Sequence, residues 1–219
     1  MLPHRNILLI FDCDGVLIDS EIISLAIDAE MLTKLGLPHT VQDVAQRFLG
    51  VSVETANKMI EQDLGHPIPE AFNTEYHSRL AAAFEKDLKI IPGVMEFLDQ
   101  WPGSICVASS SSQARLKTTL TQVGLFTRFA PHIYSAEMVS RGKPHPDLFL
   151  YTANNMGFAP DKCIVIEDSI NGIKAARAAG MKCLGFVGGS HCNAEHAKFL
   201  RDAGAEQVFA KMDQLFALI

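Results

Sequence analysis

The sequence has few of the features that mark membrane, secreted or disulfide-bonded proteins. It contains no long apolar run. The first apolar run, Ile7 to Phe11, has only five residues and ends before Asp12. Such a run is too short for a signal sequence or a membrane-spanning helix. Five cysteines are an odd number for a disulfide framework, and Cys106, Cys163 and Cys183 lie inside apolar runs. We therefore expect reduced, buried thiols and a cytoplasmic location.

Basic residues are also scarce. The 19 lysines and arginines are outnumbered by 25 aspartates and glutamates, which gives a net charge of -6. An acidic protein repels phosphate backbones and anionic lipid, so we expect neither nucleic acid nor a membrane as a partner. A phosphorylated ligand would need a local cation or a loop of amides. With 219 residues, 48% of them hydrophobic, the chain can bury a core without disulfides.

Short apolar runs predict the strands of a sheet that is covered on both faces, because the runs are nearly continuous and do not alternate. They span residues 6–11, 104–108, 132–134, 162–166, 182–186 and, less clearly, 207–209. Helices are predicted between most of these strands, with Ser112, Ser169 and Asn193 as N-terminal caps. Alternating strands and helices predict an α/β fold with a Rossmann-like, doubly wound parallel sheet.

One interval breaks this alternation. Residues 19–87 show no strand pattern, and four helices are predicted there, over residues 20–35, 41–48, 52–64 and 70–85. A helical block of that length is too long for an ordinary connection between two strands. We therefore predict two domains. Residues 1–18 and 88–219 form the core, and residues 19–87 form an inserted helical cap.

Polar residues follow each of the first four core strands, either directly or after a short interval. In chain order they are Asp12 and Asp14, Ser109 and Ser110, Lys143, and Glu167 and Asp168. Singly, each has an ordinary explanation as a turn, a helix cap or a surface charge. Together they are expected to meet, because ligands bind at the carboxyl ends of the strands of an open parallel sheet. Serine hydroxyls and amides at such a turn can bind phosphate, and adjacent carboxylates suit Mg²⁺.

These segments resemble the haloacid dehalogenase superfamily, in particular its helical-cap phosphatases near the β-phosphoglucomutase and phosphoglycolate phosphatase branch. The resemblance covers essentially the whole chain. Its anchors are FDCDGVLIDS at residues 11–20, VASS at 107–110, GKP at 142–144 and IEDSING at 166–172. The resemblance implies a Mg²⁺-dependent phosphatase that hydrolyses a small phosphorylated metabolite of the sugar-phosphate or phospho-sugar-acid type.

The resemblance also implies residue roles for the chemical step. Asp12 would be the nucleophile that forms an aspartyl-phosphate. Asp14 would be the general acid and base. Ser109, Ser110 and Lys143 would hold the transferring phosphoryl group.

A metal site is implied by the same resemblance. Asp12 and Asp168 would ligate Mg²⁺, together with the backbone carbonyl of Asp14. Glu167 would act either as a further ligand or indirectly, through a neighbour. These acids and a dianionic phosphate would place five negative charges together, which a cation and a lysine must offset.

The helical cap carries fewer signals. Gly50 lies in a Leu-Gly-Val-Ser stretch that resembles the substrate-facing turn of such caps, and Arg47 is a candidate substrate contact or an ordinary surface charge. Sugar-phosphate mutases of this branch carry a basic residue and a histidine at positions that match Val53 and Ser24 here. Hydrolysis is therefore expected in preference to mutase chemistry.

Rival functions stay open on the sequence alone. A mutase of the same family is one, and a non-enzymatic switch phosphorylated on aspartate is another. A dehalogenase would also use an aspartate nucleophile, but it needs neither a metal nor a second acid two residues later. Asp14, Glu167 and Asp168 therefore count against a dehalogenase. His191, Cys192 and His196 are interpreted as a polar loop and helix start in preference to a transition-metal site. The sequence does not rank the substrates, and a monomer is the expectation for the assembly.

Overall fold

The chain divides into two units in a computed structural model, which describes residues 6–48 and 53–219. One unit comprises the chain up to Asp19 together with Lys89–Ile219, and the other comprises Ser20–Leu88. The two segments that link them run antiparallel within the first unit, where Asp19 N donates to Lys89 O at 2.9 Å and Ile18 bridges to Ile90.

The first unit is built on a parallel sheet with the strand order β3-β2-β1-β4-β5-β6. The strands are β1 (Leu8–Phe11), β2 (Ser104–Ser109), β3 (Ile133–Ser135), β4 (Cys163–Glu167), β5 (Lys182–Phe186) and β6 (Gln207–Phe209). Connections run outward from β1 to β3 on one side, and then from β4 to β6 on the other. The predicted strands and the α/β, doubly wound fold are confirmed.

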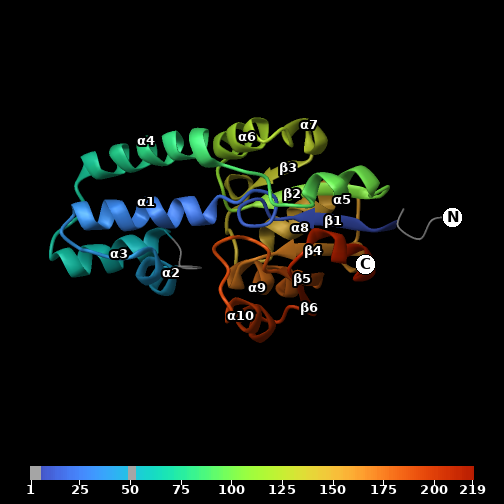
Figure 1. The fold of residues 1–219 in the computed structure, drawn as a ribbon. Coiled ribbons are helices and arrows are strands. Elements are labelled where there is room, and N and C mark those ends of the chain that lie inside the picture. The colour runs from blue at the N-terminus through green and yellow to red at the C-terminus, as the bar shows by residue number, and fades with distance from the viewer. Residues whose placement is uncertain (1–5, 49–52) are drawn as a thin grey trace. The chain divides into compact units, whose positions relative to one another are not determined.

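Helices cover both faces of this sheet, and Figure 1 shows α6 and α7 on one side and α9 and α10 on the other. The first group contains α5 (Val94–Gln100), α6 (Gln113–Gln122), α7 (Phe126–Phe129) and the 3₁₀ helix η4 (Met212–Ala217). The second contains α8 (Asp147–Met156), α9 (Ile170–Ala178) and α10 (His196–Ala203). Two short 3₁₀ helices, η2 (Ala136–Met138) and η3 (Pro160–Lys162), lie in the connections.

Burial on both faces explains the unbroken apolar run of β1. The Phe11 ring lies 6.1 Å from the rings of Phe97 in α5 and Phe129 in α7. Ile10 points to the opposite face, where it shares a buried cluster with Leu148 of α8 and Ile173 of α9. Because successive side chains of a strand point to opposite faces, each residue of β1 has an apolar partner.

The helix caps are partly as predicted. The hydroxyl of Ser112 accepts from Arg115 N at 3.2 Å, and the hydroxyl of Ser169 accepts from Gly172 N at 3.0 Å. The predicted cap at Asn193 is wrong, because α10 begins at His196 and Glu195 is its cap residue. Asn193 Oδ1 instead accepts from the backbone of both residues, at 2.9 and 3.1 Å, and so shapes the turn before the helix.

The second unit is helical. It contains α1 (Glu21–Lys34), α2 (Val41–Phe48), α3 (Val53–Leu64) and α4 (Glu70–Asp87). Its own buried cluster comprises Leu25, Ala29, Leu32 and Val44. The predicted helices are present, and α4 continues two residues past its predicted end at Glu85. Within the described parts of both units, we find no helix with the length and hydropathy needed to cross a bilayer.

Candidate active site

The register of the sheet brings the end of β1 level with the ends of β2 and β4. Phe11 pairs with Val107 of β2 and with Ile166 of β4, so Asp12 lies level with the next residue of each strand. Asp12 N donates to Ile166 O at 2.9 Å, which continues the pairing past the strand. The direction of the connections reverses at β1, and in open α/β sheets ligands bind at such a point.

Lys143 lies at the centre of this edge, with only 3% of its side chain exposed. Its Nζ donates to Asp12 Oδ1 at 2.9 Å and to Ala108 O at 3.0 Å, and it pairs with Glu167. Burial disfavours the charged ammonium and lowers the pKa of Lys143. The negative charges of Asp12 and Glu167 have the larger combined effect, and they raise that pKa above its ordinary value. The lysine is therefore a fixed positive charge beside Asp12.

Three buried carboxylates converge here. Ligand oxygens of Asp12, Glu167 and Asp168 all lie within 4.8 Å of one another. Burial raises the pKa of Asp12, and the charges of Glu167, Asp168 and Asp14 raise it further, with Lys143 as a partial offset. Burial and then Glu167 raise the pKa of Asp168. When all three are ionised, one lysine leaves an excess of two negative charges, and the oxygen ligands suit a hard divalent cation such as Mg²⁺.

Glu167 is held by its own chain at both oxygens. Its Oε1 faces Lys143, and its Oε2 accepts from Ser169 N at 3.0 Å and from Ser169 Oγ at 2.9 Å. A Cβ on Gly172 would lie 1.9 Å from this carboxylate. The first turn of α9 therefore admits Glu167 only because residue 172 is glycine.

Asp14 is bound to a different group of donors. Its Oδ2 accepts from Ser111 Oγ at 2.6 Å, and its Oδ1 accepts from Arg115 Nη2 at 2.9 Å. Neither donor was predicted, because the sequence pattern marks Ser112 only as a helix cap and gives Ser111 and Arg115 no role. The available signal was the position of Arg115 in the first turn of α6, directly after the predicted phosphate-binding loop.

The two serines of that loop lie between β2 and α6. Ser109 is almost fully buried, and its hydroxyl accepts from Ser111 N at 3.1 Å. Ser110 is exposed. The loop leads into the N-terminus of α6, whose dipole favours an anion at this end.

The two candidate substrate contacts predicted in the helical cap, Arg47 and Gly50, belong to a different part of the chain from the residues above. Arg47 belongs to α2 in the helical unit, where it forms an ion pair with Asp63 of α3 and lies 5.2 Å over the Phe48 ring. Gly50 lies outside the described residues.

Comparison with known proteins shows the family to which the chain belongs. Residues 8–180 match the family model of haloacid dehalogenase-like hydrolases. A conserved haloacid dehalogenase-like protein of Agrobacterium tumefaciens is 43% identical, with 96% of each chain covered and a TM-score of 0.88. A HAD family hydrolase of Deinococcus radiodurans, solved with bound phosphate and sodium, is 31% identical, with 98% of this chain and 95% of that chain covered and a TM-score of 0.81. The 6-phosphogluconate phosphatase of Escherichia coli is 26% identical, with 83% of this chain and 82% of its own covered. The chain therefore belongs to the haloacid dehalogenase-like hydrolases, as its sequence motifs indicate.

Proposed function

We propose that this hydrolase is a Mg²⁺-dependent phosphatase of small phosphorylated metabolites, of the sugar-phosphate or phospho-sugar-acid type. The observation that carries the proposal is the convergence of Asp12, Lys143 and Asp168 at the carboxyl edge of the sheet. The similarity to the 6-phosphogluconate phosphatase of E. coli supports the substrate class.

The proposed reaction has two halves. In the first, a carboxylate oxygen of Asp12 attacks phosphorus, the bond to the leaving alcohol breaks, and Asp14 gives that alcohol a proton. In the second, Asp14 takes a proton from water, and the water oxygen attacks the aspartyl-phosphate. Inorganic phosphate leaves and Asp12 is restored. One carboxyl group thus serves as acid and then as base, as covalent catalysis in two steps requires.

Charge balance decides what else the site needs. Asp12, Glu167 and Asp168 with a dianionic phosphate amount to five negative charges, against the single positive charge of Lys143. Asp12, Asp168 and the backbone carbonyl of Asp14 would hold Mg²⁺, with Glu167 as a further ligand or as the residue that holds Lys143. When bound, the ion supplies two positive charges that offset repulsion between nucleophile and phosphate.

The phosphoryl oxygens would be bound by this chain's own donors. We assign the Ser109 hydroxyl, the Ser110 amide and the Lys143 ammonium to them. The three donors of Lys143 Nζ are directed at Asp12, Ala108 and Glu167, so the donor now given to Asp12 would turn to a phosphoryl oxygen while the other two contacts hold the ammonium in place.

Two positions of the helical unit favour hydrolysis over mutase chemistry. Val53, where the mutases carry a basic residue, has 77% of its surface exposed and no charge. Ser24, at the position of their histidine, has a buried hydroxyl with no hydrogen-bond partner among the described residues. Neither residue carries the positive charge that the mutases place there for a second phosphate, and Arg47 is already paired with Asp63.

The test is phosphate release from a panel that includes 6-phosphogluconate, glucose 6-phosphate and phosphoglycolate, with Mg²⁺ or with EDTA. We expect many phosphates per chain with Mg²⁺ and background release with EDTA. A switch would give about one stable phosphoryl group per chain, and a mutase would give an isomerised sugar phosphate without net release. Either result would contradict the proposal.

A further inference from the structure

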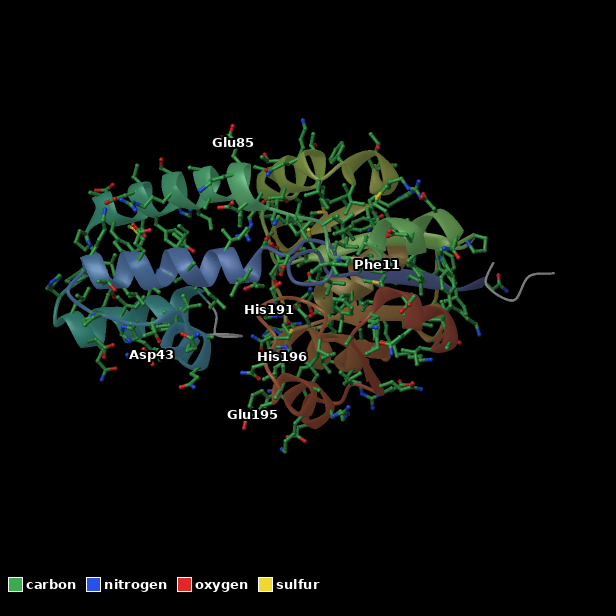
Figure 2. The ribbon with its side chains drawn as sticks, in the orientation of Figure 1. Phe11, Asp43, Glu85, His191, Glu195 and His196 are labelled. Carbon is green, nitrogen blue, oxygen red and sulfur yellow. The ribbon has the colours of Figure 1, made fainter. Side chains whose placement is uncertain are left out.

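Two histidines beside Asp168 have no part in the proposed reaction. His191 follows β5, and His196 is the first residue of α10. Figure 2 shows their side chains close together, and their ring centroids are 5.3 Å apart at 90°. Both residues are buried, with 8% and 6% of their surfaces exposed. An unpaired polar group is costly to bury, so a buried histidine requires a hydrogen-bond partner.

Both rings are directed at Asp168. Nε2 of His191 lies 3.1 Å from Asp168 Oδ2, and Nε2 of His196 lies 2.6 Å from the backbone oxygen of Asp168. A carbonyl oxygen only accepts hydrogen bonds, so Nε2 of His196 carries the proton and donates it. An ionised carboxylate likewise requires the proton on Nε2 of His191. One histidine therefore contacts the side chain of Asp168, and the other contacts its main chain.

The packing around His191 fixes this contact. A Cβ on Gly15 would lie 1.8 Å from Asp168 Oδ2 and 2.9 Å from His191 Cε1. A Cβ on Gly189 would lie 2.7 Å from both Cε1 and Nδ1 of His191. The imidazole and the carboxylate thus share a space that two glycines leave open.

The same contacts argue against an independent transition-metal site. Ligand atoms of His191, Cys192 and His196 lie within 4.8 Å of one another, and Cys192 Sγ is 3.4 Å from His191 Nε2. However, Nε2 of each histidine already faces Asp168, and the Nδ1–Cε1 edge of His191 packs on Gly189. The cluster is therefore organised around Asp168.

We propose that His191 is a positioning residue that fixes the Asp168 carboxylate for a divalent cation, while His196 fixes the backbone at the same residue. This inference rests on the metal site of the proposed function. Metal-binding carboxylates are themselves held by hydrogen bonds, and loss of such a partner typically weakens metal binding by about 10- to 100-fold.

The test is calorimetric titration of metal-free protein with Mg²⁺ alone, without substrate. We expect His191→Ala to raise the Kd for Mg²⁺ by about 10- to 100-fold. His191→Gln should recover part of the affinity, because its amide nitrogen can reach the position of Nε2. His132→Ala is the matched control, since His132 is exposed in the same unit, and it should leave the Kd unchanged. In phosphate release, the Mg²⁺ concentration for half-activation should rise with the Kd, while kcat at saturating Mg²⁺ changes by less than about threefold.

The outcomes separate this inference from the function on which it rests. Wild-type protein that neither binds Mg²⁺ nor responds to it refutes the metal site, and the inference with it. Wild-type protein that binds Mg²⁺ while His191→Ala binds it equally well refutes the inference alone, as does a lower kcat at unchanged affinity. If His191→Ala fails to fold, His191→Asn replaces it in the titration, because the asparagine amide is too short to reach Asp168. Folded His191→Asn that binds Mg²⁺ as tightly as the wild type would overturn the proposal.

Discussion

Gly15 illustrates how the site depends on single residues. It follows Asp14 with a φ of +75°, a conformation that costs other L-residues roughly 1–2 kcal/mol. It also lies where a Cβ would come within 1.8 Å of Asp168 Oδ2. The residue is therefore required for two separate reasons, one of backbone conformation and one of space beside a carboxylate.

A pair of substitutions separates these reasons. Gly124 has nearly the same φ, +76°, but within the described part of the chain no atom beyond its immediate neighbours lies within 4 Å of its Cβ position. We expect Gly124→Ala to lower the free energy of unfolding by about 1–2 kcal/mol, and Gly15→Ala to lower it further, because its Cβ would overlap Asp168 Oδ2; urea denaturation measures both. Only Gly15→Ala should also weaken Mg²⁺ binding and phosphate release. Equal activity in the two variants would show that the space beside Asp168 is not critical.

At the scale of the element, α6 and α9 both begin with a serine N-cap, but the two cap serines have different neighbours. Ser112 caps α6 through Arg115 N, and Ser169 caps α9 through Gly172 N. Ser169 additionally donates its hydroxyl to Glu167, the residue paired with Lys143. The second cap is thus connected to the proposed phosphoryl-binding lysine, and the first is not.

Removal of each hydroxyl should reveal this difference. Ser112→Ala and Ser169→Ala are each expected to cost about 1 kcal/mol of stability. We expect kcat to fall for Ser169→Ala, because Glu167 loses a donor and Lys143 loses part of its fixed position, and to stay near wild type for Ser112→Ala. Thermal denaturation and phosphate release measure the two effects, and equal kcat values would argue against a link through Glu167.

How far the elements could be predicted depends on the kind of signal. The strands were predictable because a run such as that of β1 is buried on both faces and has to be continuously apolar. Asp12, Lys143 and Asp168 could be grouped because the carboxyl ends of parallel strands meet at one edge, although the sequence gives no distances between them. The start of α10 was misplaced because Asn193 resembles a cap residue but organises the preceding turn.

Contacts between side chains of distant segments could not be predicted in this way. Arg115 reaches Asp14 across 101 positions of the chain, and no periodicity or capping rule predicts such a contact. His191 reads as a polar loop residue, because its burial against Asp168 depends on glycines at positions 15 and 189. Such contacts follow from the assembled fold and not from any local pattern.

For the molecule as a whole, the buried carboxylates link stability to pH and to metal. The pKa values of Asp12 and Asp168 are raised in the folded, metal-free protein. The folded state therefore binds more protons than the unfolded chain, so the contribution of these groups to stability is present below their ordinary pKa. It is lost as pH rises through their folded values.

Mg²⁺ should reverse this loss, since a cation takes the place of the protons. We expect Mg²⁺ to raise the melting temperature more at about pH 7.5 than at about pH 5, relative to EDTA. Scanning calorimetry under the four conditions measures the effect. A Mg²⁺-induced shift that is equal at both pH values, or larger at the acidic one, would contradict the account.

The most direct test of the central claim, that Asp12 is the nucleophile, is the phosphate release rate of Asp12→Asn at saturating Mg²⁺ on the best substrate of the panel. We predict a loss on the order of 10⁴-fold or more in a variant that folds as the wild type does. Folded Asp12→Asn that retains more than about a tenth of the wild-type rate would show that another group attacks phosphorus.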